Sequence, residues 1–216
     1  MVEDSKQHPS VLSALEDVPE IHVEALFDEA DRWYNYKRIS LFAAVQAVSL
    51  PGDYVQLGVY KGRCARFLVN LMPRSRKLYL LDSFEGLPED WIGPWRKGAF
   101  SLAQEQRPLF RQPNVEVVPG WFSETVPVLA GRLNQPLALI HADADLYSST
   151  LEALEGLDGH IVPGTVIVFD EYMIRAGDEV ADDEHRALLD WCRNRNRGFE
   201  YLWKTRWAQV GIRVTK

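Results

Sequence analysis

Residues 53–68, DYVQLGVYKGRCARFL, pass from a short apolar run through a glycine-containing turn into a stretch with helical spacing. The run YVQLG leads into a helix expected over 63–71, which is the pattern of a buried parallel strand followed by its crossover helix. Gly58 and Gly62 lie in the turn, where the missing side chains let the backbone approach a ligand. This segment predicts a strand–turn–helix unit with a ligand site at the end of its strand.

The same alternation of short apolar runs and helix-like stretches continues through the rest of the chain. Continuous apolar runs are typical of parallel strands buried on both faces, and the helices between them imply right-handed crossovers. Near the end, FEYLW (199–203) and WAQVGIRV (207–214) alternate like an antiparallel pair. We expect an α/β fold with a doubly wound, mostly parallel seven-stranded sheet, helices on both faces and an antiparallel C-terminal strand pair. The other strands are KLYLLD (77–82), VEVV (115–118), LALIHAD (137–143) and TVIVFD (165–170), and the other helices lie near 123–130, 148–157 and 182–196.

The N-terminal part of the chain shows a different pattern. Apolar residues at helical spacing predict one helix over 21–34 and a second over 39–50, which Pro51-Gly52 stops. The full length of 216 residues is that of one ordinary α/β domain. We therefore divide the chain into an N-terminal helical extension, 1–50, and one main domain, 51–216.

Composition excludes several classes of partner. The net charge is −7, from 24 Lys and Arg against 31 Asp and Glu, which argues against nucleic acid or an anionic membrane as the main partner. The apolar runs are far shorter than the roughly 20 residues that cross a bilayer, so no membrane span is expected. The opening MVEDSKQHPS matches neither a secretory signal nor a transit peptide, and we expect a cytoplasmic protein that folds alone or as a homo-oligomer. Cys64 and Cys192 are expected to be buried thiols.

Asp82 ends the run KLYLLD, about twenty residues beyond Gly62, as in nucleoside-binding folds. An acid at this place can accept hydrogen bonds from both hydroxyls of a ribose. The turn at Gly58 lacks the last glycine of the dinucleotide fingerprint and the Gly-Lys-Ser/Thr of a phosphate loop. Together these features favour a nucleoside-containing cofactor other than a dinucleotide or a nucleoside triphosphate. The alternative is a capping aspartate in a turn that binds no ligand.

Asp143 and Asp170 each end an apolar run, and Glu171 follows directly. If the two strands are neighbours, the three carboxylates converge on one edge of the sheet. A set of ligands made only of oxygen favours Mg²⁺, Mn²⁺ or Ca²⁺ over zinc. The alternative is a cluster of acids at strand ends that is held by helix N-caps and lysines.

Four sequence blocks follow one another along the chain: DSFEGLPED (82–90), GWFSETVP (120–127), HADADLYSST (141–150) and PGTVIVFDEY (163–172). Together they resemble the macrocin O-methyltransferases, a family of antibiotic-sugar methyltransferases, over about residues 53–172. The resemblance implies a class I S-adenosylmethionine-dependent methyltransferase domain over 51–216, a Mg²⁺ site, and methyl transfer to a hydroxyl of a small molecule, such as a sugar or a glycosylated natural product.

The resemblance also implies roles for single residues. Asp143, Asp170 and Glu171 match the metal carboxylates, and Asp143 also matches the proposed general base. The family usually has a second aspartate where this chain has Glu171, whose extra methylene moves the carboxylate. Gln56 stands where class I enzymes often carry an acid. Gly58 and Gly62 match the methionine-side loop, and Asp82 matches the ribose acid. The other expected cofactor-binding residues are Gln56, Ser83 and Trp121, whose turn could border the adenine or belong to the core. The expected substrate residues are Trp91, Trp95 and Tyr172.

The positions of several tryptophans and histidines in the sequence suggest their roles. Trp91 and Trp95 lie in a loop broken by Pro and Gly after the Asp82 strand, which suits a lid or sugar-stacking wall, or else a hydrophobic plug. His141 is expected to be buried and hydrogen-bonded. His185 is expected to be solvated on a charged helical face, with a role as substrate base as the alternative. The tryptophans expected in the core are Trp33, Trp191, Trp203 and Trp207.

Two other functions remain open from the sequence. The triplet Asp143-Ala144-Asp145 also resembles the Asp-x-Asp of metal-dependent glycosyltransferases, which bind a nucleotide sugar through Mn²⁺. That reading leaves the Gly58 turn and the DSFEGLP block without a role. The other alternative is a non-catalytic protein that binds S-adenosylmethionine but has lost metal competence through Glu171.

Overall fold

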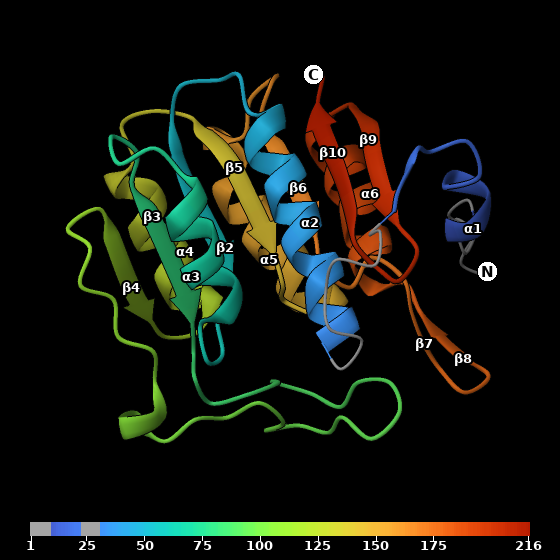
Figure 1. The fold of residues 1–216 in the computed structure, drawn as a ribbon, viewed down its shortest axis with the longest axis horizontal. Helices are drawn as coiled ribbons and strands as arrows, with labels where there is room; N and C mark the ends of the chain where they lie inside the picture. The colour runs from blue at the N-terminus through green and yellow to red at the C-terminus, as the bar shows by residue number, and fades with distance from the viewer. Residues whose placement is uncertain (1–9, 23–30) are drawn as a thin grey trace, which may run out of the picture.

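The computed structural model describes residues 10–22 and 31–216, and within them it confirms the expected α/β architecture. A central sheet of eight strands has helices on both of its faces (Figure 1). In sheet order the strands are β1 (Glu20–Ile21), β9 (Phe199–Thr205), β10 (Val210–Val214), β6 (Val166–Phe169), β5 (Leu137–Ala142), β2 (Asp53–Leu57), β3 (Leu78–Asp82) and β4 (Val115–Pro119).

The strands β6, β5, β2, β3 and β4 are parallel, as the apolar runs predicted. Every residue of β2, β5 and β6 is buried, because helices cover this part of the sheet on both sides. Strand β10 is antiparallel to both β6 and β9, which confirms the predicted C-terminal pair. The eighth strand, β1, was not predicted, and its two residues pair with Lys204 and Thr205 at the sheet edge.

Two layers of helices enclose the sheet, one on each side (Figure 1). The four helices from α3 to α6 lie where the sequence predicts them. Cys64 and Cys192 lie in these helices as buried free thiols. Among the described residues, no helix is both long and apolar enough to cross a bilayer. One face carries α2 (Arg32–Ala47) and α3 (Arg63–Leu71), and the other carries α4 (Phe122–Arg132), α5 (Tyr147–Leu157) and α6 (Asp183–Arg195); short elements are α1 (Val11–Ala14), η2 (Gln104–Gln106) and η3 (Asp158–His160).

Two N-terminal helices were predicted, with a break between them at 35–38. The structure has one continuous helix there, α2. It runs through 35–38, which contain no glycine or proline, so nothing interrupts its hydrogen bonds. Ile21 belongs to β1 instead of the first predicted helix, and residues 23–30 of that helix lie outside the described residues. Helix α2 packs on the same sheet as the rest of the chain. The division into 1–50 and 51–216 stays a prediction.

Two irregular segments border the carboxyl ends of the parallel strands. The connection 83–114 joins β3 to β4 and passes beneath these strand ends (Figure 1). A hairpin of β7 (Ile174–Ala176) and β8 (Glu179–Ala181) follows β6. The hairpin was not predicted, because strands of three residues show too little periodicity. Both segments lie at the edge where a ligand site is expected.

Candidate active site

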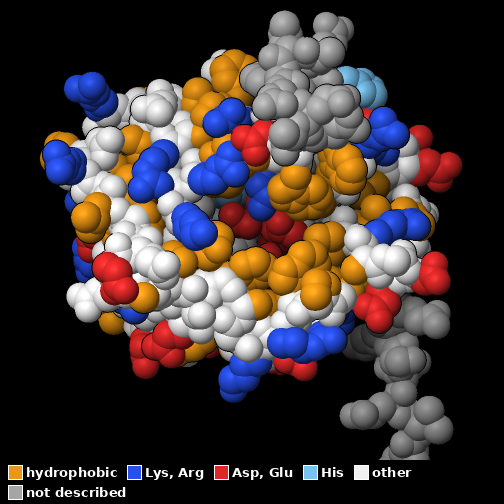
Figure 2. All heavy atoms as spheres, turned by 60° about the horizontal axis from the view of Figure 1, so that its bottom comes forward, with side chains coloured by type: hydrophobic (Ala, Val, Ile, Leu, Met, Phe, Trp, Pro, Cys, Tyr) orange, Lys and Arg blue, Asp and Glu red, His pale blue; other side chains and the backbone are white. Residues whose placement is uncertain are grey.

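A cavity of about 1150 Å³ opens at the carboxyl ends of the parallel strands. Its walls come from the segments that follow β2 to β6, from the connection 83–114 and from one side of α2. Figure 2 shows acidic side chains deep in a hollow of this face, with hydrophobic side chains around them. The position agrees with the rule that ligands of open parallel sheets bind beyond the strand ends.

Gly58 shapes the turn after β2 and lines the cavity. Its φ of +82° lies in the left-handed region, and a Cβ built on it would come within 1.8 Å of the Asp143 carbonyl oxygen. Only glycine therefore allows the turns after β2 and β5 to approach this closely. Gly62 also has a positive φ, at the N-cap of α3, but it packs against Pro108 and Phe110 and is not among the residues that line the cavity.

Replacing Gly58 by Ala is expected to lower the unfolding temperature, because the new Cβ would meet a backbone carbonyl and the left-handed conformation would be strained. Such strain alone costs about 1–3 kcal/mol. Thermal unfolding followed by circular dichroism measures the effect. Gly131→Ala is the matched control: nothing lies within 4 Å of its added Cβ, and alanine favours the helix. Equal unfolding temperatures for the two variants would refute the close approach at Gly58.

Asp82 connects the turns after β2 and β3. Its Oδ2 accepts hydrogen bonds from the backbone N–H groups of Val59 and Tyr60, each at 2.7 Å, and its Oδ1 accepts one from Phe84 at 2.6 Å. Asp82 also lines the cavity. An ionised carboxylate offers about four acceptor positions, so capacity for a ligand hydroxyl remains. The capping role is thus present in the structure, and the ribose contact stays a prediction.

The other predicted cofactor residues divide into two groups. Ser83 and Trp121 line the cavity together with Gly58 and Asp82. Gln56 is fully buried beneath the cavity, where its Nε2 donates to the carbonyl of Gly58 at 2.9 Å. In this arrangement Gln56 supports the conformation of the turn and does not face the space where a ligand would lie.

An aromatic wall borders the cavity beside the acidic residues. Trp91 and Trp95 lie there with ring centroids 5.2 Å apart, and the indole N–H of Trp91 donates to Asp183 on α6 at 3.2 Å. Trp33 and Trp207 were expected in the core, but they line the cavity with ring centroids 6.0 Å apart. Trp33 lies in the first turn of α2 and Trp207 between β9 and β10, so both project past the body of the sheet.

The structure corrects two expectations near β6. Tyr172 was expected to contact substrate, but it is fully buried, and its hydroxyl lies 2.8 Å from that of Tyr201 and 2.7 Å from Nδ1 of His185. His185 was expected to be solvated, but it is also fully buried. The sequence of α6 is rich in charged residues, but Glu184 and His185 are both buried in the structure. Neither Tyr172 nor His185 lines the cavity.

The predicted carboxylates do converge. Strands β5 and β6 are parallel neighbours, so Asp143 and Asp170 follow adjacent strand ends. Two further residues complete the cluster: Asp145, which was considered only in the glycosyltransferase alternative, and Lys37 from α2, which was missed. The Nζ of Lys37 forms an ion pair with Asp170 and lies 2.9 Å from Glu171 Oε1 and 3.5 Å from Asp143 Oδ1.

The sequence contains a signal for Lys37 and for Asp145. Lys37 lies one turn from Trp33 and one turn from Leu41 on the side of α2 that faces the sheet and cavity, so it is a lone cation on an otherwise apolar stripe. Asp145 is the second acid of HADAD, and it adopts a left-handed φ of 62° that is uncommon for a residue other than glycine.

Burial and mutual repulsion alter the titration of the cluster. Burial and the charge of Asp170 raise the pKa of Asp143 to about 6, and burial and Asp143 raise the pKa of Asp145 to about 8. Burial also raises the pKa of Asp170, but Lys37 and His141 outweigh it, so the net pKa is lowered. Burial lowers the pKa of Lys37, and the surrounding carboxylates raise it well above its usual value. Lys37 is therefore a cation among groups whose negative charge it only partly balances.

The donor set fits a hard divalent cation. Carboxylate oxygens of Asp143, Asp145 and Glu171 lie within 4.8 Å of one another. The Oε2 atom of Glu171 is buried and has no hydrogen-bond partner among the described residues. The backbone N–H of Glu171 donates to the buried Glu184 at 3.0 Å, which fixes its position. Oxygen ligands and uncompensated negative charge are what Mg²⁺, Mn²⁺ and Ca²⁺ require.

Comparisons with known proteins identify relatives of this chain. The family described as Macrocin-O-methyltransferase (TylF) matches residues 30–190. The 8-demethyl-8-(2,3-dimethoxy-alpha-L-rhamnosyl)-tetracenomycin-C 4'-O-methyltransferase of Streptomyces olivaceus is 32% identical over 159 residues, which are 64% of this chain and 60% of that protein. The demethyldecarbamoylnovobiocin O-methyltransferase of Streptomyces niveus is 31% identical over 66% of this chain and 61% of its own length. This chain thus spans about three fifths of these relatives.

Among solved structures, the calicheamicin methyltransferase CalS11 has a similar fold. Its TM-score is 0.64 with 22% sequence identity, over 82% of this chain and 77% of that one. The likeness agrees with a class I methyltransferase fold.

Proposed function

Because this chain belongs to the macrocin O-methyltransferase family, we propose that it transfers a methyl group from S-adenosylmethionine to a hydroxyl of a sugar or a glycosylated natural product. The observation that carries the proposal is a single cavity bordered by the Gly58 turn, by Asp82 and by the acidic cluster. The names of the two relatives support the acceptor class, since one is named for a rhamnosyl tetracenomycin and the other for a novobiocin derivative.

We propose that the cofactor binds at the end of the cavity nearest β2 and β3. Gly58 would leave space for the methionine part, Asp82 would accept hydrogen bonds from the ribose hydroxyls, and Ser83 and Trp121 would border the rest of the nucleoside. The support is that these four residues line one cavity. Gly62 and Gln56 would act indirectly, by shaping the turn and the start of α3.

We propose that the acceptor binds against the aromatic wall. The rings of Trp91, Trp95 and Trp207 offer flat apolar surfaces that suit the faces of sugars and fused rings. Arg175 and Arg206 line the same cavity and add hydrogen-bond donors for acceptor oxygens. Packing of these side chains around the acceptor would exclude water from the transfer step.

The acidic cluster would supply the chemistry at the acceptor hydroxyl. Asp143, Asp170 and Glu171 would hold Mg²⁺, which when bound lowers the pKa of a hydroxyl and orients neighbouring oxygens. Asp143 accepts the hydroxyl proton. The acceptor oxygen then forms its bond to the methyl carbon as the sulfur–carbon bond breaks, and that electron pair stays on sulfur to give S-adenosylhomocysteine. Alignment of the oxygen, carbon and sulfur atoms provides most of the rate.

The test is an assay of glycosides, free sugars and catechols with S-adenosylmethionine and Mg²⁺. We expect one acceptor class to gain the mass of a methyl group, with an equal amount of S-adenosylhomocysteine released. A chelator should stop the reaction, and restored Mg²⁺ should return it. Transfer that continues unchanged in excess chelator would remove the metal from the proposal.

Metal affinity should increase with pH. Asp143 and Asp145, with pKa values raised to about 6 and about 8, carry protons at pH 6 that a divalent cation must displace. We expect Mg²⁺ to bind more tightly at pH 8 than at pH 6, with protons released on binding. Calorimetry in buffers of different ionisation enthalpy measures both quantities. An affinity that is flat across this interval would contradict the assigned titration.

A further inference from the structure

The first turn of helix α6 contacts two parts of the cavity at once. Asp183 and Glu184 are consecutive residues of this turn. Asp183 Oδ2 accepts the indole N–H of Trp91 at 3.2 Å, and Glu184 Oε2 accepts the backbone N–H of Glu171 at 3.0 Å. The turn therefore joins the aromatic wall to the acidic cluster.

Trp91 and Trp95 form a pair on the connection 83–114. Their ring centroids lie 5.2 Å apart, and the backbone N–H of Trp91 donates to the carbonyl of Trp95 at 2.9 Å. Both residues line the cavity. A contact that fixes the ring of Trp91 therefore fixes the position of the pair.

Asp183 holds this pair from the body of the domain. Helix α6 is anchored in the core by Leu188, Trp191 and Cys192, so its first turn has a fixed place. The side chain of Asp183 is 17% exposed, and its Oδ1 accepts a hydrogen bond from Arg186 at 2.8 Å. The second partner limits rotation of the carboxylate, and a hydrogen bond to a charged acceptor is stronger than a neutral one.

Two further hydrogen bonds attach the connection 83–114 to neighbouring elements. Ser148 of α5 donates to Glu89 at 2.6 Å, and Glu179 of the β7–β8 hairpin accepts the backbone N–H of Gly93 at 3.3 Å. Both of these bonds are exposed to solvent, whereas the bond from Trp91 to Asp183 is partly buried. Water competes less for a buried bond, so Asp183 contributes most to the placement of the Trp91 ring.

The same turn sets the spacing between the aromatic pair and the carboxylates. Glu171 and Glu184 are both buried, and Glu184 follows Asp183 directly, so adjacent residues of one helix hold Trp91 and Glu171. A sugar ring stacked on Trp91 would carry hydroxyls at different distances from the acidic cluster. Which hydroxyl reaches the cluster depends on where the stacking surface lies, and a misplacement of about 1 Å can cost about 100-fold in rate.

We propose that Asp183 is a specificity-determining residue for the acceptor. It fixes Trp91 and Trp95 relative to the acidic cluster, and so selects the hydroxyl of a stacked sugar ring that receives the methyl group. Because it acts through Trp91, it is a positioning residue and not a catalytic one. This inference rests on the proposed function and adds to it the residue that sets the position of methylation.

The test identifies the products of methyl transfer to methyl α-L-rhamnoside, whose ring hydroxyls give monomethyl ethers that NMR distinguishes. We expect wild type to methylate mainly one hydroxyl, and Asp183→Ala to give a mixture. Asp183→Ala should also lower kcat/KM for the glycoside by about tenfold or more, while the KM of S-adenosylmethionine changes by less than about threefold. The cofactor is spared because its proposed place is at the other end of the cavity.

Asp182→Ala is the matched control. Asp182 is the N-cap of α6 and also pairs with Arg186, at 2.9 Å, but it is not among the residues that line the cavity. The variant removes the same charge from the same helix end and should keep the wild-type products. Asp183→Asn should keep them too, because its amide oxygen can still accept the indole N–H. A mixture of products from all three variants would show a general effect of the helix end and overturn the proposal.

Trp91→Phe breaks the same hydrogen bond from the other side and retains a flat ring. It should give a mixture of products as Asp183→Ala does, and the two changes together should do no more than either alone. Wild-type products from Trp91→Phe would overturn the proposal, and this result does not depend on the folding of Asp183→Ala.

The outcomes separate this inference from the proposed function. If wild type gives one main product and Asp183→Ala gives the same one, the inference is refuted and the methyltransferase proposal stands. A mixture from wild type itself, or methylation of catechol without methylation of the glycoside, also refutes the inference. Wild type that binds S-adenosylmethionine but methylates no acceptor refutes the proposed function and this inference with it.

Discussion

Replacing Asp143 by Asn is expected to abolish methyl transfer while S-adenosylmethionine still binds. The carboxylate is both the proposed base and a proposed metal ligand, and a positioned general base alone contributes about 10²–10⁴-fold to the rate. Asparagine preserves the shape of the side chain, and the contact with Gly58 is made by the backbone of Asp143, which the substitution does not change. Initial rates at saturating cofactor measure the loss, and calorimetry measures cofactor binding.

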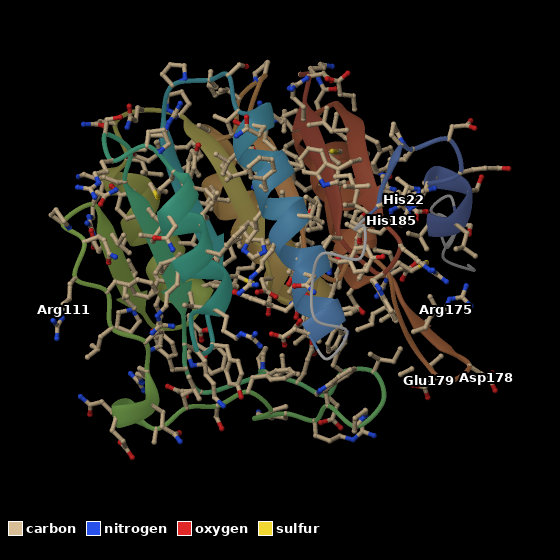
Figure 3. All side chains as sticks on the ribbon, viewed as in Figure 1. His22, Arg111, Arg175, Asp178, Glu179 and His185 are labelled. Atoms are coloured by element: carbon tan, nitrogen blue, oxygen red, sulfur yellow. The ribbon has the colours of Figure 1, made fainter. Side chains whose placement is uncertain are left out.

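Asp178→Asn is the matched control for this prediction. Asp178 is exposed at the tip of the β7–β8 hairpin, where Figure 3 shows it with Glu179, pointing away from the strand ends. The same change of charge at this place should leave the rate unaltered. An Asp143→Asn enzyme that retained the rate of the control would show that another group accepts the proton.

Replacing Asp82 by Ala is expected to weaken S-adenosylmethionine binding strongly. The cofactor would lose a charged acceptor for its ribose, worth about 1.5–3 kcal/mol, which corresponds to roughly 10–100-fold in the dissociation constant. The variant would also leave three backbone N–H groups of Val59, Tyr60 and Phe84 without their acceptor, so two turns that border the cavity would loosen. Calorimetric titration of the cofactor measures the change.

Asp53→Ala controls for the loss of a capping aspartate. Asp53 accepts the backbone N–H of Lys77 at 2.9 Å, at the opposite end of the same pair of strands, away from the cavity that Asp82 lines. This variant should lose stability but keep its cofactor affinity. If both variants bound the cofactor like wild type, the ribose assignment of Asp82 would be wrong.

The sheet could be predicted because its strands are buried on both faces. Runs such as LALI (137–140) and VIVF (166–169) are apolar at every position, and this property does not depend on knowing which strands are neighbours. The shorter elements were missed for the opposite reason. The two residues of β1 and the three-residue strands of the β7–β8 hairpin are held by partners distant in sequence or by a turn, and they carry no pattern of their own.

The candidate site could be predicted only in part. Asp82, Asp143 and Asp170 follow predicted strands, and strand ends meet at one edge of the sheet, so their convergence follows from topology. Lys37 comes from a helix whose placement over β5 and β6 no local pattern specifies. Tyr172 was expected to contact substrate because it follows the strand-end carboxylates, but its side chain is buried in the core, and no sequence pattern specifies its direction.

The most direct test of the central claim is a calorimetric titration of the wild-type protein with S-adenosylmethionine, in the presence and absence of a nucleotide sugar. We expect saturable binding of one S-adenosylmethionine per chain, which the nucleotide sugar does not alter. Failure to bind S-adenosylmethionine, together with binding of the nucleotide sugar in the presence of Mn²⁺, would contradict the methyltransferase account and favour the glycosyltransferase reading of Asp143-Ala144-Asp145.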